Sequence, residues 1–575
     1  MGEALHEVSV PRRRSVLRAA PALTVGILLL PIGAGLVGTL LPAFGYLPAI
    51  GGHSFNLDGW RTLAGYPGFR TSVALTLSTG ILTSVLAVTL ALGFCAWTHD
   101  RGWMRRLGAA LAPILSTPHS ALALGLAFLL APSGWIVRAV SPWLTGWTLP
   151  PDVATVGDSR GLALVLGLLL KEVPYLILMI VGALNQVPAR AHLAIARALG
   201  YGPAEAWLKT ILPQIYPQIR LPIYAVIAFS LSVVDVALIL GPSNPPPLAV
   251  LAVRWFGDAD IQFYFPAAAA ATLLLLLVAV VVALWYGLER VAMRVGRAWI
   301  ARGGRSGIAT AGAALATLSF GIAFALAALA IAGMALWSFA AQWRFPDALP
   351  QVWSLANWMR RAASLAEPAW LTLVIGVLAT AIALCLVLAC LENESRGHRR
   401  AGTAALWILY VPLLVPQVAF LFGAQVLLVR MNYDGTLAAV VWAHLVFVLP
   451  YLFLSLADPW RAFDPRYAQT AASLGASAGR IFFRIKLPLL LRPVLIACAV
   501  AFAVSVGQYL ATVFAGNGRV PTLTTEAVTL AAGADRRVIG AYAVAQAVFP
   551  LVAYAGAVLL PALLFANRRA LRGLR

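Results

Sequence analysis

Two adjacent residues of opposite charge, Lys171 and Glu172, interrupt a long apolar run of this chain. Asp235 interrupts another run, and Gln508 lies at an approximately corresponding place in the second half. Charged groups are costly in hydrocarbon, so those that occur there usually face a water-filled path or pair with a polar partner. Lys171, Glu172, Asp235 and Gln508 are therefore candidate residues of a solute path. Pairing between helices is the alternative for each of them.

No pattern of residues predicts bond-making catalysis. The sequence contains no Gly-x-Ser-x-Gly and no His-Glu-x-x-His motif. The four cysteines lie in apolar runs without a Cys or His partner at zinc-ligand spacing. Of the three lysines only Lys209 precedes a Ser or Thr, and Trp207-Leu208 stands where a phosphate-binding loop needs glycine. We expect no enzyme activity, no metal site and no cofactor bound directly to the chain.

The composition indicates the class of protein in which these residues occur. Apolar residues make up 61% of the 575-residue chain, charged residues make up 11%, and the mean hydropathy is +0.86. Soluble proteins carry about 25% charged residues. The chain is therefore predicted to be an integral membrane protein, which excludes a soluble enzyme, a disordered scaffold and a secreted disulfide framework.

Apolar runs of the length that spans a bilayer, about 20 residues, occur twelve times and divide as six plus six. We predict an all-α integral membrane protein with about twelve transmembrane helices in a 6+6 tandem pseudo-twofold repeat. The predicted spans lie near 19–45, 70–97, 108–132, 160–183, 217–241, 263–287, 310–340, 367–391, 403–428, 435–457, 490–513 and 539–566.

Basic residues fix the predicted orientation. Lys and Arg outnumber Asp and Glu by 42 to 21. If the N-terminus is cytoplasmic and the spans alternate, most basic residues fall on the cytoplasmic side, as the positive-inside rule requires. The excess charge is then explained by the lipid bilayer without a nucleic-acid partner. We expect a multi-pass protein of the cell (inner) membrane with both termini in the cytoplasm.

The two halves share a cytoplasmic loop. Gly200 and Gly475 are 275 positions apart, and so are Pro213 and Pro488. The chain is thus predicted to be a tandem duplication. Residues 1–299 form the first half with a loop at 188–213 (loop 1), and residues 300–575 form the second with a loop at 464–488 (loop 2).

Each loop has the pattern of a helix, a glycine that permits a left-handed turn, and a second short amphipathic helix. Apolar residues exposed on such a hairpin would seek a partner. A helix that lies on the lipid headgroups is the alternative. The residues that define the pattern are Ala194, Ala196, Gly200, Trp207, Leu212 and Pro213 in loop 1, and Gln469, Ala471, Gly475, Phe482, Leu487 and Pro488 in loop 2.

This spacing, with nine residues between Gly200 and Thr210 and a terminal Leu-Pro, resembles the cytoplasmic loop of permease subunits of binding-protein-dependent ABC importers. The resemblance extends along almost the whole chain. It is strongest to the fused, double-length permeases of the thiamine, ferric-iron and related uptake group. Where that family has Glu, this chain has Ala194 and Gln469, so any ion pair made by that Glu is absent or weakened here.

The resemblance implies that both loops are coupling helices that dock on a cytoplasmic ABC ATPase subunit, in two copies, which uses the ATP. It also implies an extracytoplasmic substrate-binding protein, which would dock on outer loops near 47–69 and 347–367. A twelve-span secondary transporter, suggested by Asp100-Arg101-Gly102 between spans two and three, is the first alternative. An intramembrane enzyme is the second.

Overall fold

The computed structural model describes residues 16–99, 104–305, 307–397, 402–533 and 535–564. The Asp100-Arg101-Gly102 motif and both chain ends lie outside these residues. Helices dominate the described residues, and the only strands there are β1 (Ala340–Gln342) and β2 (Val352–Trp353), which pair antiparallel. The predicted all-α membrane class is confirmed.

The first half has long membrane helices separated by short segments. Its helices are η1 (Val16–Ala19), α1 (Ala20–Ala43), η2 (Pro48–Ile50), α2 (Asp58–Gly65), α3 (Phe69–Thr98), α4 (Met104–Ser116), α5 (His119–Leu130), α6 (Trp135–Val140), α7 (Leu162–Leu184), α8 (Ala189–Ala198), α9 (Pro203–Ala206), η3 (Trp207–Ile211), α10 (Leu212–Ser232), α11 (Asp235–Leu240), α12 (Leu248–Phe256), η4 (Ile261–Phe263) and α13 (Tyr264–Ala301).

The second half repeats this order. Its helices are α14 (Ile308–Phe339), α15 (Ala356–Gly397), α16 (Thr403–Leu414), α17 (Gln417–Arg430), α18 (Leu437–Arg461), α19 (Pro465–Ser473), α20 (Ala478–Ile481), η5 (Phe482–Lys486), α21 (Leu487–Leu489), α22 (Leu491–Val506), α23 (Leu510–Gly516), α24 (Leu523–Leu530) and α25 (Arg536–Leu564). The predicted junction near residue 300 lies where α13 ends and α14 begins.

Fewer helices than the predicted twelve are both long and apolar enough to cross a bilayer. Within the described residues there are nine such helices, or up to eleven if two bent pairs each count as one span. The fifth predicted span is the one that differs. Its helix α10 has 21 residues, but Gln214, Gln218 and Arg220 make its first turns polar. The prediction of about twelve spans therefore exceeds the number of such helices in the described residues by one to three.

The first helix of each half packs against the other half. Helix α1 makes its most extensive contacts with α17, and α14 packs on α3 and α5. Small residues allow the close approach: a methyl group added at Gly35 would collide with the backbone of Phe420, and one at Gly125 with Ala330. The two halves are therefore interlocked rather than placed side by side as independent bundles.

A repeated side-chain contact also relates the halves. The Thr76 hydroxyl accepts a hydrogen bond from the backbone N–H of Leu248, at the start of α12, at 2.9 Å. In the second half the Thr372 hydroxyl accepts one from Leu523, at the start of α24, also at 2.9 Å. Both bonds satisfy an N–H group that the first turn of a helix leaves unpaired.

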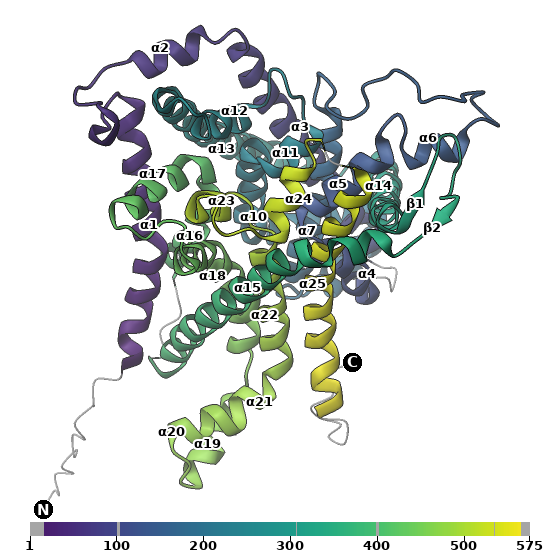
Figure 1. Cartoon of the computed structure of the whole chain (residues 1–575). Coiled ribbons are helices and arrows are strands. Elements are labelled where there is room, and N and C mark those ends of the chain that lie inside the picture. Colours follow the sequence, from purple (N-terminus) through teal and green to yellow (C-terminus); the bar gives the residue numbers. More distant parts are fainter. Residues whose placement is uncertain (1–15, 100–103, 306, 398–401, 534, 565–575) are drawn as a thin grey trace, which may run out of the picture.

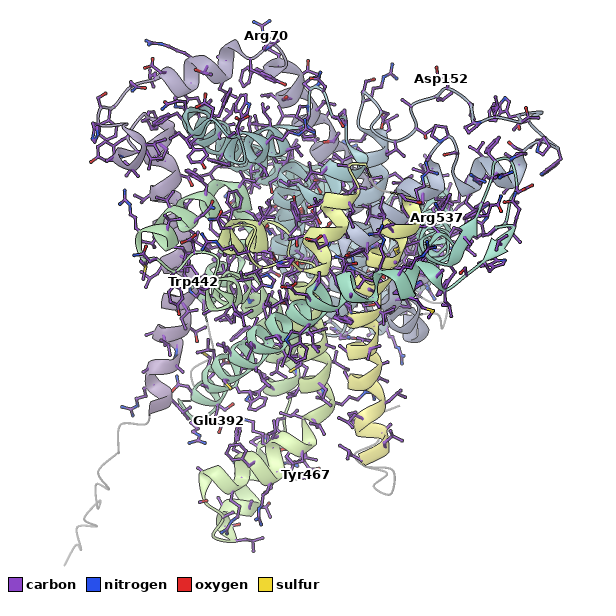
Figure 2. The ribbon with its side chains drawn as sticks, viewed as in Figure 1. Arg70, Asp152, Glu392, Trp442, Tyr467 and Arg537 are labelled. Carbon is purple, nitrogen blue, oxygen red and sulfur yellow. The ribbon has the colours of Figure 1, made fainter. Side chains whose placement is uncertain are left out.

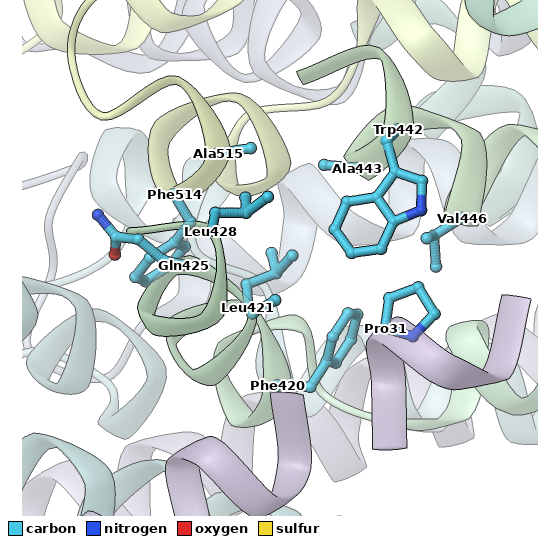
Figure 3. Close-up of a pocket in the computed structure, with 11 residues that line it drawn as sticks. Pro31, Phe420, Leu421, Gln425, Leu428, Trp442, Ala443, Val446, Phe514 and Ala515 are labelled. Carbon is cyan, nitrogen blue, oxygen red and sulfur yellow. The ribbon is translucent and has the colours of Figure 1, made fainter. Parts of the chain in front are cut away.

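Loop 2 projects from one end of the molecule, and α25 ends on the same side (Figure 1). Figure 2 places Glu392 and Tyr467 toward this end and Arg70 and Asp152 toward the opposite end. An apolar niche at the seam between α1 and the second half is lined by Pro31, Phe420, Trp442 and Val446 (Figure 3). It belongs to the packing of α1 and carries no charged group among its described lining residues.

Candidate functional site

Loop 1 has the predicted helix–glycine–helix form. Helix α8 ends at Ala198, and Gly200 then adopts φ +83°, a left-handed conformation that residues with a Cβ rarely take. The N–H groups of Gly200 and Tyr201 donate to the carbonyl oxygens of Arg197 and Ala196, which closes the helix. Helix α9 and η3, a π-helical turn, then lead into α10.

Loop 2 has the same geometry. Helix α19 is capped by Asp464, and Gly475 adopts φ +80°. Helix α20 is followed by η5, a second π-helical turn, which begins 275 positions after the first. Such π turns are rare, so their occurrence at equivalent positions shows that the repeat extends to backbone geometry.

The predicted loop residues divide into buried and exposed sets. Ala196, Ala471 and Trp207 are buried, and Phe482 is half-buried with its ring 6.0 Å from that of Trp460. Ala194 and Gln469, which replace the family glutamate, are exposed. Leu212, Leu487 and Pro488 are half-buried and Pro213 is exposed, where each loop enters the next membrane helix.

Exposed apolar side chains cover the outer face of both loops. Ile195 and Leu199 are exposed on loop 1. On loop 2 Leu474 is 82% exposed and Phe483 is 67% exposed, and Tyr467 is also exposed. Apolar groups gathered on a projecting hairpin indicate a protein contact surface.

The two loops leave the bundle next to one another. Gln186, which follows α7 and precedes loop 1, donates through Nε2 to Oδ2 of Asp458 near the end of α18, at 3.4 Å. Both loops therefore begin at the same end of the molecule. Loop 1 is also bonded to α3, because Arg197 donates to Nε2 of His99 at 3.2 Å.

Buried ion pairs join the helices at this end. Lys486 in η5 donates to Oε2 of Glu392 at 2.9 Å and to the Ser395 hydroxyl at 3.1 Å, both in α15. In the first half Arg220 in α10 lies 2.9 Å from Oε2 of Glu289 in α13. Neither Glu392 nor Glu289 is among the site residues predicted from the sequence. The available signal was an acidic residue close to the cytoplasmic end of each of two predicted spans.

Inside the membrane, four helices are broken and polar residues lie at the breaks. The breaks separate α4 from α5, α10 from α11, α16 from α17 and α22 from α23. Transporters use such discontinuous helices to bring polar groups to a solute path. Two of the breaks lie close together. Gly507, between α22 and α23, approaches Pro118, between α4 and α5, because a Cβ added at Gly507 would lie 3.9 Å from the Pro118 Cβ.

Lys171 lies at one of these breaks. Its ammonium group donates to the carbonyl oxygens of Ile114, Leu115 and Thr117 at 3.0, 2.9 and 2.6 Å. These carbonyls lie at the end of α4, where a helix leaves its last acceptors unpaired. Lys171 thus caps the end of α4, which agrees with pairing between helices, the alternative to a place in the solute path.

Glu172 points toward a different set of groups. Its Oε1 lies 3.8 Å from Nε2 of His119. It is within electrostatic range of the Tyr175 and Tyr451 hydroxyls, and Tyr410 interacts with both tyrosines. Tyr175 and Tyr451 follow a proline in the matching segments Val173-Pro174-Tyr175-Leu176 and Leu449-Pro450-Tyr451-Leu452, which are 276 positions apart, so this polar cluster lies where the two halves meet.

Asp235 is the first residue of α11 and is half-buried. It lies within electrostatic range of Tyr509. Gln508 is buried in the break before α23, beside Tyr509. The 275-residue offset pairs Asp235 with Leu510 rather than Gln508, but both polar residues lie at the same break of the repeated helix.

His444 has two polar partners: its ring nitrogens lie 2.8 Å from the hydroxyls of Ser505 and Thr512. Within the described residues, no group of three or more His, Cys, Asp or Glu side chains is placed to hold a metal ion.

Comparison with known proteins identifies the family to which these features belong. The chain is 32% identical over 506 residues to the inner membrane ABC transporter permease protein YnjC of Escherichia coli (strain K12). The alignment covers 87% of this chain and 90% of that protein. The chain belongs to the ABC transporter permeases. The predicted resemblance to a fused, double-length permease is confirmed.

Shorter relatives match about a third of the permease. The molybdenum transport system permease protein ModB of Mycobacterium tuberculosis (strain ATCC 25618 / H37Rv) is 34% identical over 188 residues, 29% of this chain and 70% of that protein. The putative 2-aminoethylphosphonate transport system permease protein PhnV of Salmonella paratyphi A (strain ATCC 9150 / SARB42) is 29% identical over 189 residues, 32% of this chain and 70% of that protein. No family model matches the permease.

Proposed function

We propose that this permease forms the solute path of an ABC importer and is driven by separate ATPase subunits, in two copies, that dock on loops 1 and 2. The observation that carries the proposal is the pair of loops of equal geometry, which leave the bundle side by side through Gln186 and Asp458. Two equivalent hairpins with exposed apolar residues suit two copies of one partner. ATP would be bound by that partner alone.

The loop end of the molecule is then the cytoplasmic end, and both termini are cytoplasmic. This orientation agrees with the side on which most basic residues fall. An extracytoplasmic binding protein would deliver the solute at the opposite end, around residues 47–69 and 347–367. Because the halves are related by a pseudo-twofold axis, the ATPase pair would act on the broken helices at two places, loop 1 and loop 2.

The polar cluster between the halves supports a path through the centre of the bundle. Glu172 and Tyr175 of the first half lie within electrostatic range of Tyr451 of the second, and Asp235 lies at a helix break. Lys171 is bonded to three carbonyl oxygens, so we assign it to the support of the α4–α5 break rather than to the solute. Gln508 and Asp235 are assigned to the wall of the path.

Reconstitution in liposomes tests the proposal. The permease is co-purified with the ATPase subunit and the binding protein encoded beside it, and solute uptake is measured with ATP or with an ion gradient alone. We expect uptake that requires ATP and the binding protein. Uptake driven by an ion gradient, with no ATPase subunit present, would establish the secondary-transporter alternative instead.

A further inference from the structure

The segment that joins the two halves crosses over loop 1. Lys209 donates through Nζ to the carbonyl oxygen of Gly304 at 2.6 Å. The backbone N–H of Gly307 donates to Oε1 of Glu205 at 2.8 Å. Glu205 is 1% exposed and Lys209 is 5% exposed, so both charged side chains of the second arm of loop 1 are covered by the joining segment.

Aromatic rings complete this contact. The Lys209 ammonium lies 4.4 Å from the ring centre of Trp299 and 4.6 Å from that of Tyr201. The Arg305 guanidinium lies 5.4 Å from the Tyr201 ring on the same side of the loop. A cation over an aromatic face is attracted to it, and the attraction is strongest where water is excluded.

The equivalent residues of loop 2 have no such cover. Adding 275 to Glu205 and Lys209 gives Arg480 and Arg484, which are both exposed. Neither arginine has an ion-pair partner among the residues whose placement is described. The acidic and basic pair of loop 1 is thus replaced in loop 2 by two arginines that face solvent.

We infer that the segment formed by Trp299, Gly304, Arg305 and Gly307 is a strap that fixes the second arm of loop 1 to the second half of the chain, so that the two loops present unequal docking surfaces. Loop 1 offers only the α8 face, with Ile195 and Leu199. Loop 2 offers both arms, with Leu474, Phe483 and two arginines, and suits an acidic surface. The docking part rests on the proposed function, and the strap itself does not.

Limited proteolysis of the purified full-length permease tests the strap without any partner. Trypsin cleaves after arginine residues, and two of its sites lie here: Arg305 is part of the strap, and Arg302 lies between Trp299 and Gly304. Replacing Glu205 and Lys209 together by Met removes both polar contacts and should speed this cleavage about tenfold, because cleavage follows the population of the open segment. Replacing Arg480 and Arg484 by Met is the matched control and should leave the cleavage rate unchanged. Equal rates in all three proteins would overturn the strap.

A cross-link tests whether the second arm of loop 1 is held against the start of α14, directly after the strap, in a chain that keeps Glu205 and Lys209. A Cβ added at Gly202 would lie 3.3 Å from Oγ1 of Thr310, so Gly202→Cys with Thr310→Cys should form a disulfide under mild oxidation, detected by peptide mapping. Ser477 is the loop 2 equivalent of Gly202, and Ser477→Cys with Thr310→Cys should not cross-link. Equal yields from the two pairs would contradict the proposal.

Retention of the co-purified ATPase subunit tests the docking part. Loss of the Arg480 and Arg484 charges should weaken retention and reduce its dependence on salt, because screened charge pairs would no longer contribute. Loss of Glu205 and Lys209 should change retention less. If the loop 2 variant retains the ATPase subunit as wild type does at every salt concentration, the loops are not unequal in the way inferred, whatever the proteolysis shows.

Discussion

The Lys486 ammonium lies 2.9 Å from the Glu392 carboxylate, and both residues are buried at the foot of loop 2. The pair joins the π turn that ends the loop to the last turns of α15. The same ammonium lies 4.4 Å from the Trp460 ring centre at the end of α18. Three helices of the second half are therefore held together where the loop leaves the bundle.

Replacing Lys486 by Met should leave the Glu392 carboxylate paired with Arg396 alone, which lies 2.8 Å away in the next turn of α15, and should destabilise this end of the protein. The expected cost is about 2 kcal/mol, that of one hydrogen bond to a charged group, because Arg396 still neutralises the carboxylate. Thermal unfolding of the purified permease in detergent measures the loss. The double variant Lys486→Met with Glu392→Gln should recover part of it, and a double variant as unstable as the sum of both single ones would show that the pair does not interact.

Replacing Gly200 or Gly475 by Val should distort the turn of the corresponding loop. Both glycines have φ near +80°, where a β-branched residue is strained. We expect normal insertion, slower uptake for each single variant and uptake uncoupled from ATP hydrolysis for the double variant. Gly479→Val, in the same loop without a positive φ, is the control. Full uptake by the double variant would count against a docking role for the loops.

The contact between loop 1 and α3 should depend on pH. His99 donates through Nδ1 to the Ala96 carbonyl at 2.8 Å, so its Nε2 accepts from Arg197. Burial, together with the Arg197 charge, lowers the pKa of His99 below 6.5. The neutral ring is thus favoured in the folded state. Its contribution to stability is complete above pH 6.5 and is lost as the pH falls through the lowered pKa.

Thermal unfolding between pH 7.5 and about pH 5 checks this dependence. The wild type should lose more stability over this range than His99→Gln, whose amide keeps its hydrogen-bonding capacity without titrating. An identical dependence of unfolding temperature on pH in the two proteins would show that His99 does not cause the loss of stability.

Replacing Asp235 by Asn should alter solute flux or affinity more than folding. The side chain is half-buried at the break before α11, within electrostatic range of Tyr509. Uptake kinetics in liposomes and thermal unfolding are measured on the same preparation. An unchanged uptake curve would make Asp235 a packing residue.

Replacing Lys171 by Met should impair folding more than it alters solute flux or affinity, the reverse of the effect expected for Asp235→Asn. Its three hydrogen bonds to carbonyl oxygens at the end of α4 would be lost. Because hydrogen bonds to charged groups contribute more than neutral ones, we expect a loss of about 2 kcal/mol. The yield of folded protein and its unfolding temperature report this loss. Normal stability with altered solute selectivity would place Lys171 in the path instead.

Apolar periodicity and the 275-residue repeat predicted the membrane class, most of the spans and both glycine turns. These features are local: a run of apolar residues needs lipid, and a glycine at the end of a helix permits a left-handed turn whatever surrounds it. Helix α10 is the exception, because Arg220 near its start pairs with Glu289 of α13, a partner that sequence spacing does not reveal.

The sequence by itself determined that the chain is a duplicated membrane protein with two equivalent hairpins, because composition and spacing are properties of the chain alone. Only the tertiary structure decided how the equivalents differ. Lys209 and Arg484 occupy the same place in the repeat, yet one is buried under the joining segment and the other faces solvent. The reason is that burial of a charge depends on which distant segment covers it, and only loop 1 lies beneath the connection between the halves.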